Sequence, residues 1–183
     1  MIYHLSLHTA GLIAGLFLLL VGVLGLVIPD SVRKFAAALP RSRVTGIVLL
    51  SLAFLWSFWL LATMEMGEFS AFRKPLLIGL PIGFFLVLRF VEEFLAVRAL
   101  GILFLLAGEP LLEAAFLRYE MSRLFVTVLA YVFIVLGLFW VTLPYLLRDQ
   151  ISWSARSNGR WTALHAIGLL YGAAILVLAF TRY

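Results

Sequence analysis

The chain has 183 residues and a mean hydropathy of +1.13; 64% of the residues are hydrophobic and 13% are charged. Soluble domains are about half apolar and about a quarter charged, so this composition excludes a soluble domain. The net charge of +5 is spread over short segments beside apolar runs, which is typical of membrane orientation signals and not of nucleic-acid binding. The absence of cysteine excludes disulfides, thiolate metal sites and a cysteine nucleophile.

Apolar runs near the length needed to cross a bilayer predict an all-α integral membrane protein with six transmembrane helices in a single domain, residues 1–183. The segment before the first run, Met1 to Ser6, lacks the basic residues of a cleavable signal. In chain order, the predicted spans are about 5–28, 44–64, 76–97, 99–117, 123–147 and 162–181.

The third and fourth spans carry charged residues and leave an alternative open. Residues 76–88 alone are too short to cross, so the third span would have to include Arg89, Glu92 and Glu93. The alternative is five crossings with an interfacial or re-entrant segment within 76–117. Pro81 and Pro110 fall inside the two spans and predict kinks there.

Basic residues between the spans predict the orientation. With six spans, nine basic residues lie on one side of the membrane and five on the other, which favours the first side as cytoplasmic and both termini outside, in a bacterial cytoplasmic membrane. The segment from Asp30 to Arg43 reads as a short amphipathic surface helix. The residues expected to contact lipid headgroups are Arg33, Lys34, Arg41, Arg43, Arg148, Arg156 and Arg160.

The first and last hairpins share a pattern. Gly22, Pro29 and Arg33 have the same spacing as Gly137, Pro144 and Arg148. Two interpretations remain open: ordinary membrane constraints, or a parallel repeat of the kind found in transporters, with the third and fourth spans as an insert.

Arg89, Glu92, Glu93, Glu109 and Glu113 form a predicted intramembrane charge cluster. If the chain turns near Arg98, Arg89 and Glu109 share a depth on adjacent helices, and the arginine is held by Glu93 and Glu109. Carboxylates in excess of arginines would then be protonated, would meet water or a cation, or would contact a partner subunit.

The histidines give a weak metal prediction. His4 and His8 share one helix face, but His165 lies on the opposite side of the membrane, so no metal site and no cofactor are predicted. Gly11 and Gly15 have the spacing of a close helix–helix contact.

No catalytic or phosphate-loop motif occurs, so we expect a non-enzymatic accessory or structural subunit of a membrane complex, with the lipid bilayer and other membrane subunits as partners. The alternative is a small transporter or proton or cation path through the carboxylates. A weaker alternative is a lipid-modifying membrane enzyme that uses the same residues.

Overall fold

The computed structural model describes residue 3, residues 5–91 and residues 93–183, and all regular structure in this part of the chain is helical. Six of the helices are long and apolar enough to cross a membrane, which confirms the all-α, multi-pass prediction at that level. They are α1 (Leu7–Val27), α3 (Arg43–Thr63), α4 (Arg73–Phe90), α5 (Leu95–Ala115), α6 (Arg123–Thr142) and α8 (Asn158–Thr181).

The third of these helices starts and ends earlier than predicted. A 3-10 helix, η2 (Gly67–Phe72), leads directly into α4, so this crossing gains its length on the N-terminal side. The prediction that the helix must extend through Glu92 and Glu93 is wrong, because α4 ends at Phe90. The chain then reverses at Phe94, whose φ of 56° lies in the left-handed region and interrupts helical geometry before Leu95.

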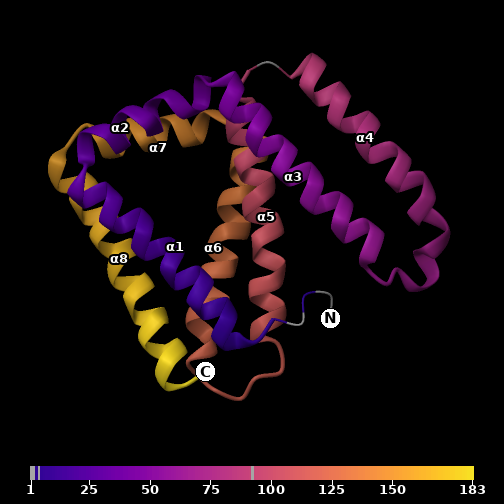
Figure 1. Cartoon of the computed structure of the whole chain (residues 1–183). Coiled ribbons are helices and arrows are strands. Elements are labelled where there is room, and N and C mark those ends of the chain that lie inside the picture. Colours follow the sequence, from indigo (N-terminus) through magenta and orange to yellow (C-terminus); the bar gives the residue numbers. More distant parts are fainter. Residues whose placement is uncertain (1–2, 4, 92) are drawn as a thin grey trace.

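Two short helices lie side by side across one end of the spanning helices (Figure 1). One is α2 (Pro29–Ala38), followed by η1 (Leu39–Arg41), and it matches the predicted surface helix. The other, α7 (Tyr145–Ala155), was not predicted: the expected fifth span ran to residue 147, whereas α6 ends at Thr142 and Pro144 precedes a separate helix. Proline favours a helix start because its missing N–H is not needed there.

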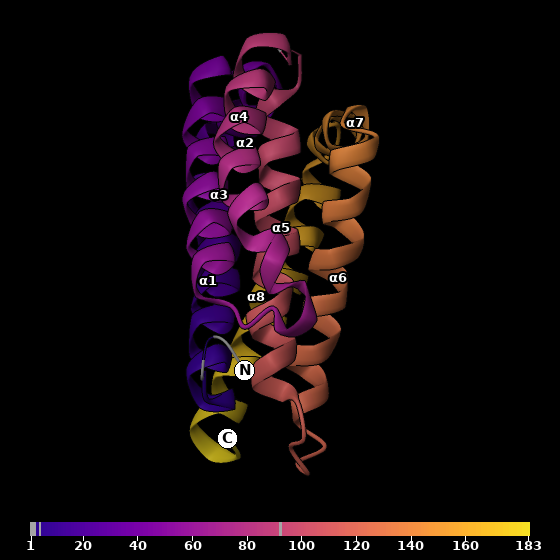
Figure 2. The same ribbon diagram turned by 90° about the vertical axis from the view of Figure 1, so that its right-hand side faces the viewer.

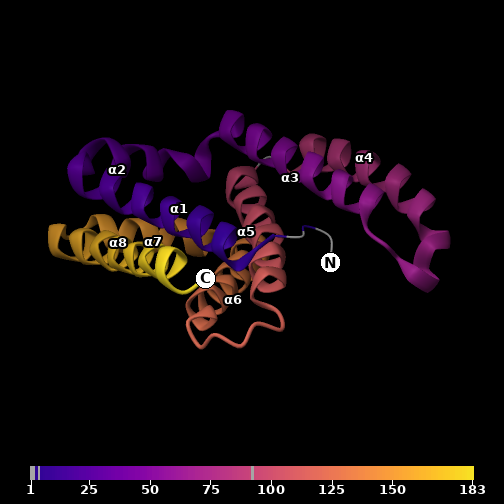
Figure 3. The same cartoon turned by 60° about the horizontal axis from the view of Figure 1, so that its bottom comes forward.

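The spanning helices form three antiparallel pairs, α1 with α8, α5 with α6 and α3 with α4, and α3 also packs against α5 (Figures 1 and 2). The α1/α8 and α5/α6 pairs meet at the end that carries the termini, where Ala14, Leu111, Val126 and Ile175 belong to one buried cluster. The α3/α4 pair projects to the side of this group (Figure 3).

Glycines allow two of the pairs to approach closely. A Cβ on Gly15 would lie 3.0 Å from the carbonyl oxygen of Gly172, and one on Gly172 would lie 2.9 Å from that of Gly15. Gly101 and Gly137 face each other in the same reciprocal way, at 2.9 and 2.8 Å. Small residues at such crossings are a standard means of bringing membrane helices together.

The predicted hairpin pattern corresponds to a repeated order of elements. A spanning helix, a surface helix and a second spanning helix occur as α1–α2–α3 and again as α6–α7–α8. The two occurrences of this order differ in the helix that their first member contacts. Gly22 of α1 faces Leu169 of α8, whereas Gly137 of α6 faces Gly101 of α5. The inserted helix α5 lies between α3 and α6 and packs against both, whereas α4 packs against α3.

Candidate functional site

The structure divides the predicted charge cluster between the two ends of the spanning helices. Arg89 lies in the last turn of α4, and together with Glu93 and Arg98 it lines an open cleft of about 500 Å³ at the α2/α7 end. Glu109 lies fourteen residues after Leu95, about 21 Å along α5 at 1.5 Å per residue. The predicted shared depth and pairing of Arg89 and Glu109 are wrong, because the chain reverses at Phe94 and not near Arg98.

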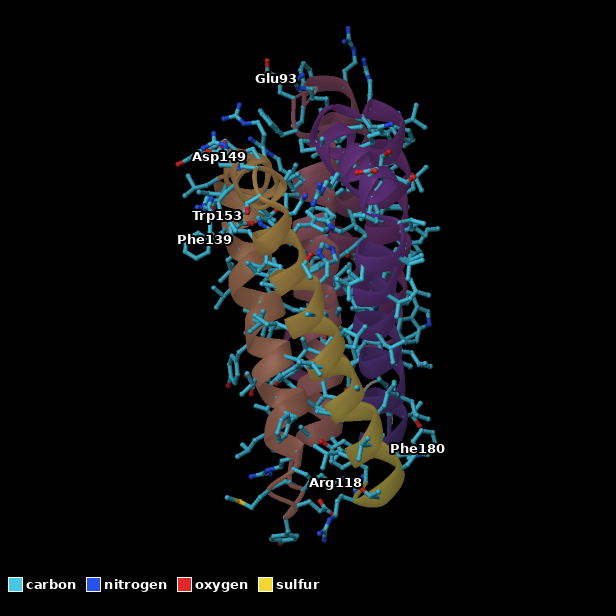
Figure 4. All side chains as sticks on the ribbon, turned by 90° about the vertical axis from the view of Figure 1, so that its left-hand side faces the viewer. Glu93, Arg118, Phe139, Asp149, Trp153 and Phe180 are labelled. Carbon is cyan, nitrogen blue, oxygen red and sulfur yellow. The ribbon has the colours of Figure 1, made fainter. Side chains whose placement is uncertain are left out.

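Figure 4 shows Glu93 at the same end of the molecule as Asp149 of α7, with Arg118, which follows α5, at the opposite end. Glu92, the remaining member of the predicted cluster, lies outside the described residues.

Glu113 has a structural contact near the N-terminus. Its Oε2 accepts a hydrogen bond from the backbone N–H of Tyr3 at 3.3 Å, and the Tyr3 hydroxyl accepts one from Trp56 Nε1 at 2.8 Å. Burial raises the pKa of the Tyr3 phenol, the hydrogen bond from Trp56 opposes this, and the charges of Glu109 and Glu113 add to the rise. These contacts link the segment before α1 to α3 and α5.

The histidines do not assemble into a site in the described part of the chain. His8 lies in the first turn of α1 with its ring 6.0 Å from that of Phe180, and His4 lies outside the described residues. Among the described residues, no group of three His, Asp or Glu side chains could hold a metal ion.

His165 is packed at the opposite end of α1. A Cβ on Gly25 would lie 1.8 Å from its ring, so glycine at this position is what admits the imidazole. Its Nδ1 is 2.9 Å from the carbonyl oxygen of Trp161, whose own indole N–H donates to the Gly25 carbonyl at 2.8 Å. Trp161 is only 4% exposed, so its ring is buried where α8 meets α1 and does not face lipid.

The basic residues concentrate at the α2/α7 end, as the orientation analysis predicts. Nine of them lie there with three described carboxylates, whereas the opposite end holds five basic and five acidic residues. The nine are Arg33, Lys34, Arg41, Arg43, Arg89, Arg98, Arg148, Arg156 and Arg160.

Several of the seven residues predicted to contact headgroups have defined neighbours. The Arg33 guanidinium lies 5.0 Å from the centre of the Trp161 ring, and that of Arg160 lies 4.7 Å from the Trp153 ring, both suitable for cation–π contact. Three others, Arg41, Arg43 and Arg148, line a cleft of about 370 Å³ between η1, α3, α7 and the α4–α5 turn. Lys34 is exposed on α2 and Arg156 follows α7.

A third, apolar cavity was missed by sequence reasoning. It has a volume of about 490 Å³, lies between α1, α3 and α5, and is lined almost entirely by apolar side chains, including Ala14, Phe17, Trp56 and Phe104. The sequence does not reveal such a cavity, because its walls come from helices far apart in the chain and each wall alone reads as an ordinary apolar span.

Helix α4 is the least covered of the spanning helices. The structure describes every residue of α4 and none of them is buried, and its main neighbour is α3, which it meets through Phe84 and Val87. Gly79 and Gly83 lie four residues apart on its outer side, and a Cβ on either would have no described atom of another element within 4 Å. Leu86 and Phe90 follow on the same helix face, 51% and 74% exposed.

The chain matches no family model, no curated protein and no solved structure. The six apolar helices place it in the class of multi-pass helical membrane proteins. Any narrower function has to be argued from its own residues.

Proposed function

We propose that this protein is a non-enzymatic accessory or structural subunit of a membrane complex, and that α4 is the helix that contacts the neighbouring subunit. The observation that carries the proposal is the pair Gly79 and Gly83 in a helix that nothing in the described chain covers on that side.

Glycine in the interior of a helix is unfavourable relative to alanine by about 0.8–1.0 kcal/mol. At several other glycines of the spanning helices close packing offsets that disadvantage, whereas Gly168 of α8 is as open as Gly79 and Gly83. At Gly15, Gly22, Gly101, Gly137 and Gly172 a Cβ would lie within 3.0 Å of a neighbouring helix. In α4 the two glycines have no such neighbour within the chain. A helix from another subunit packed on this face would offset the cost of the two glycines, because glycines spaced four apart allow close contact between membrane helices.

The orientation that we propose follows the charge. All of the basic excess lies at the α2/α7 end, and cytoplasmic segments of membrane proteins carry the excess of Lys and Arg. We therefore assign that end to the cytoplasm of a bacterial cell, with both termini outside.

Gentle purification tests the proposal. Extracted in mild detergent from its own membrane, the protein is expected to elute with a stoichiometric membrane partner, identified by mass spectrometry and by native mass. A well-behaved lone monomer under these conditions, together with no adduct after cross-linking in the intact membrane, would contradict the proposed role.

The transport alternative has less support from the geometry. Arg89 and Glu93 lie at one end, and Glu109 and Glu113 lie well along α5 toward the other, so the proposed counter-ion Arg89 is far from Glu109 and Glu113. The alternative stays a prediction: Glu109→Gln would abolish a proton- or cation-coupled flux in proteoliposomes. Absence of any flux in the unsubstituted protein would argue against it. The weaker lipid-enzyme alternative relied on the same grouping of carboxylates, and it loses support for the same reason.

A further inference from the structure

Two adjoining clefts at the α2/α7 end share the same basic residues. The first, of about 370 Å³, is lined by Pro40, Arg41, Ser42, Arg43 and Arg148 together with residues of the α4–α5 turn. The second, of about 330 Å³, lies between α2, η1 and α7. Arg41 and Arg148 line both clefts, although they are more than a hundred residues apart in the chain.

The fold holds these side chains near each other by packing beneath them. Leu39 of η1 packs against a buried cluster of Val97, Trp140 and Leu147, so η1 and the start of α7 are fixed on the same apolar base. Arg41 follows Leu39 by two residues and Arg148 directly follows Leu147. The backbone that carries both arginines is therefore held on one packed apolar base and is not a free loop.

The charges at the first cleft are mainly positive. Glu93 is the described carboxylate among its lining residues, against three arginines. Arg148 also contacts Asp149, its neighbour in sequence, at 3.0 Å, but both side chains are more than half exposed. Such an exposed pair is weak, and an arriving anion can replace or share it.

The backbone adds to this positive character. The cleft lies at the N-terminus of α3, where Ser42 accepts a hydrogen bond from the Thr45 N–H at 3.2 Å. The positive end of a helix dipole favours an anion in this position. Guanidinium groups are well suited to phosphate, because their parallel N–H donors match two phosphate oxygens.

We propose that the cleft between η1, α3 and α7 binds a phosphate group, with Arg41 and Arg148 as its main ligands. Its position beside the surface helices α2 and α7 makes the phosphodiester of an anionic membrane lipid the first source to test, and a soluble phosphate the second. This site is independent of α4 and of the proposed subunit role.

The experiment uses the full chain in lipid nanodiscs and reads retained lipid by native mass spectrometry. In discs that mix phosphatidylglycerol with phosphatidylcholine, the unsubstituted protein is expected to retain phosphatidylglycerol selectively. The double variant Arg41→Gln/Arg148→Gln is expected to bind it about thirtyfold more weakly, at the usual contribution of a basic residue near an anionic membrane surface. The matched control is Arg118→Gln/Arg182→Gln, which removes the same charge from the opposite end and is expected to leave retention unchanged.

A second arm separates the two sources of phosphate. In discs of phosphatidylcholine alone, inorganic phosphate is added and the midpoint of thermal unfolding is followed. A rise that the Arg41/Arg148 variant loses would assign the site to a soluble phosphate. Folding of each variant is checked by circular dichroism. The variant Arg41→Lys/Arg148→Lys keeps the charge, and its binding is expected to lie between that of the unsubstituted protein and that of Arg41→Gln/Arg148→Gln. Equal retention by the variant and the control, with no effect of phosphate, would overturn the proposal.

Discussion

Replacing Gly137 with leucine is expected to lower the free energy of unfolding by about 2 kcal/mol, the range for overpacking a tight contact. The reason is the crossing of α5 and α6, where a Cβ on Gly137 would lie 2.8 Å from the carbonyl oxygen of Gly101. That atom belongs to a helix backbone and cannot rotate away, so the two helices must move apart. Gly172→Leu is expected to have a similar effect on the α1/α8 pair. Reversible unfolding in detergent, followed by circular dichroism, measures both.

Gly168→Leu is the control for these two substitutions. Gly168 lies in α8, four residues before Gly172, but a Cβ there would have no described atom of another element within 4 Å. The control is expected to be neutral or slightly stabilising, because leucine favours a helix more than glycine does. Equal stability of Gly137→Leu and Gly168→Leu would contradict the packing described for α5 and α6.

The double substitution Gly79→Leu/Gly83→Leu is expected to separate association from stability. A Cβ at either position would have no described neighbour within 4 Å, so we expect the isolated protein to fold normally and to gain up to about 1 kcal/mol per position from helix propensity. Association with the neighbouring subunit should be lost, because leucine at two successive turns keeps a second helix from approaching closely. Co-purification in mild detergent, with unfolding measured in parallel, shows whether both effects occur.

Gly168→Leu serves as the control here as well, since it adds the same side chain to an open surface on a different helix. Retained co-purification by the α4 variant would show that this face is not the contact. Loss of co-purification by the variant and the control alike would point to a general effect of added bulk.

The sequence predicts the spanning helices well because each is a long apolar run, and hydropathy alone identifies such runs. It predicts their ends less well. The residues before Pro75 include Glu68, Arg73 and Lys74 and read as a loop, yet these three lie in η2 and the first turn of α4. The backbone N–H of Phe69 donates to the carbonyl of Met66 at the start of η2, and the guanidinium of Arg73 donates to the carbonyl of Met64.

The predicted pairing of Arg89 with Glu109 failed because the chain reverses at Phe94. A reversal through a left-handed residue is normally signalled by glycine or asparagine, but here it occurs at Phe94. With no such signal, the turn was expected near Arg98. The shift of about one helical turn places Arg89 in the last turn of α4, at the α2/α7 end of the spanning helices.

Glycine spacing shows a different limit of sequence reasoning. Gly11 and Gly15 share the spacing of Gly79 and Gly83, but the first pair contacts α8 and the residues after it, whereas the second has no partner within the chain. The pattern predicts that a close contact is possible, and only the fold shows which pair is already used.

Site-specific photo-crosslinking in the intact membrane tests the central proposal, that α4 contacts another subunit, most directly. A photoreactive residue at Leu86, on the face of Gly79 and Gly83, is expected to give a defined protein–protein adduct whose mass identifies the neighbour or a second copy of the chain. The same residue at Leu170, which is 67% exposed on α8, is expected to give lipid adducts. Lipid adducts alone at both positions would contradict the account.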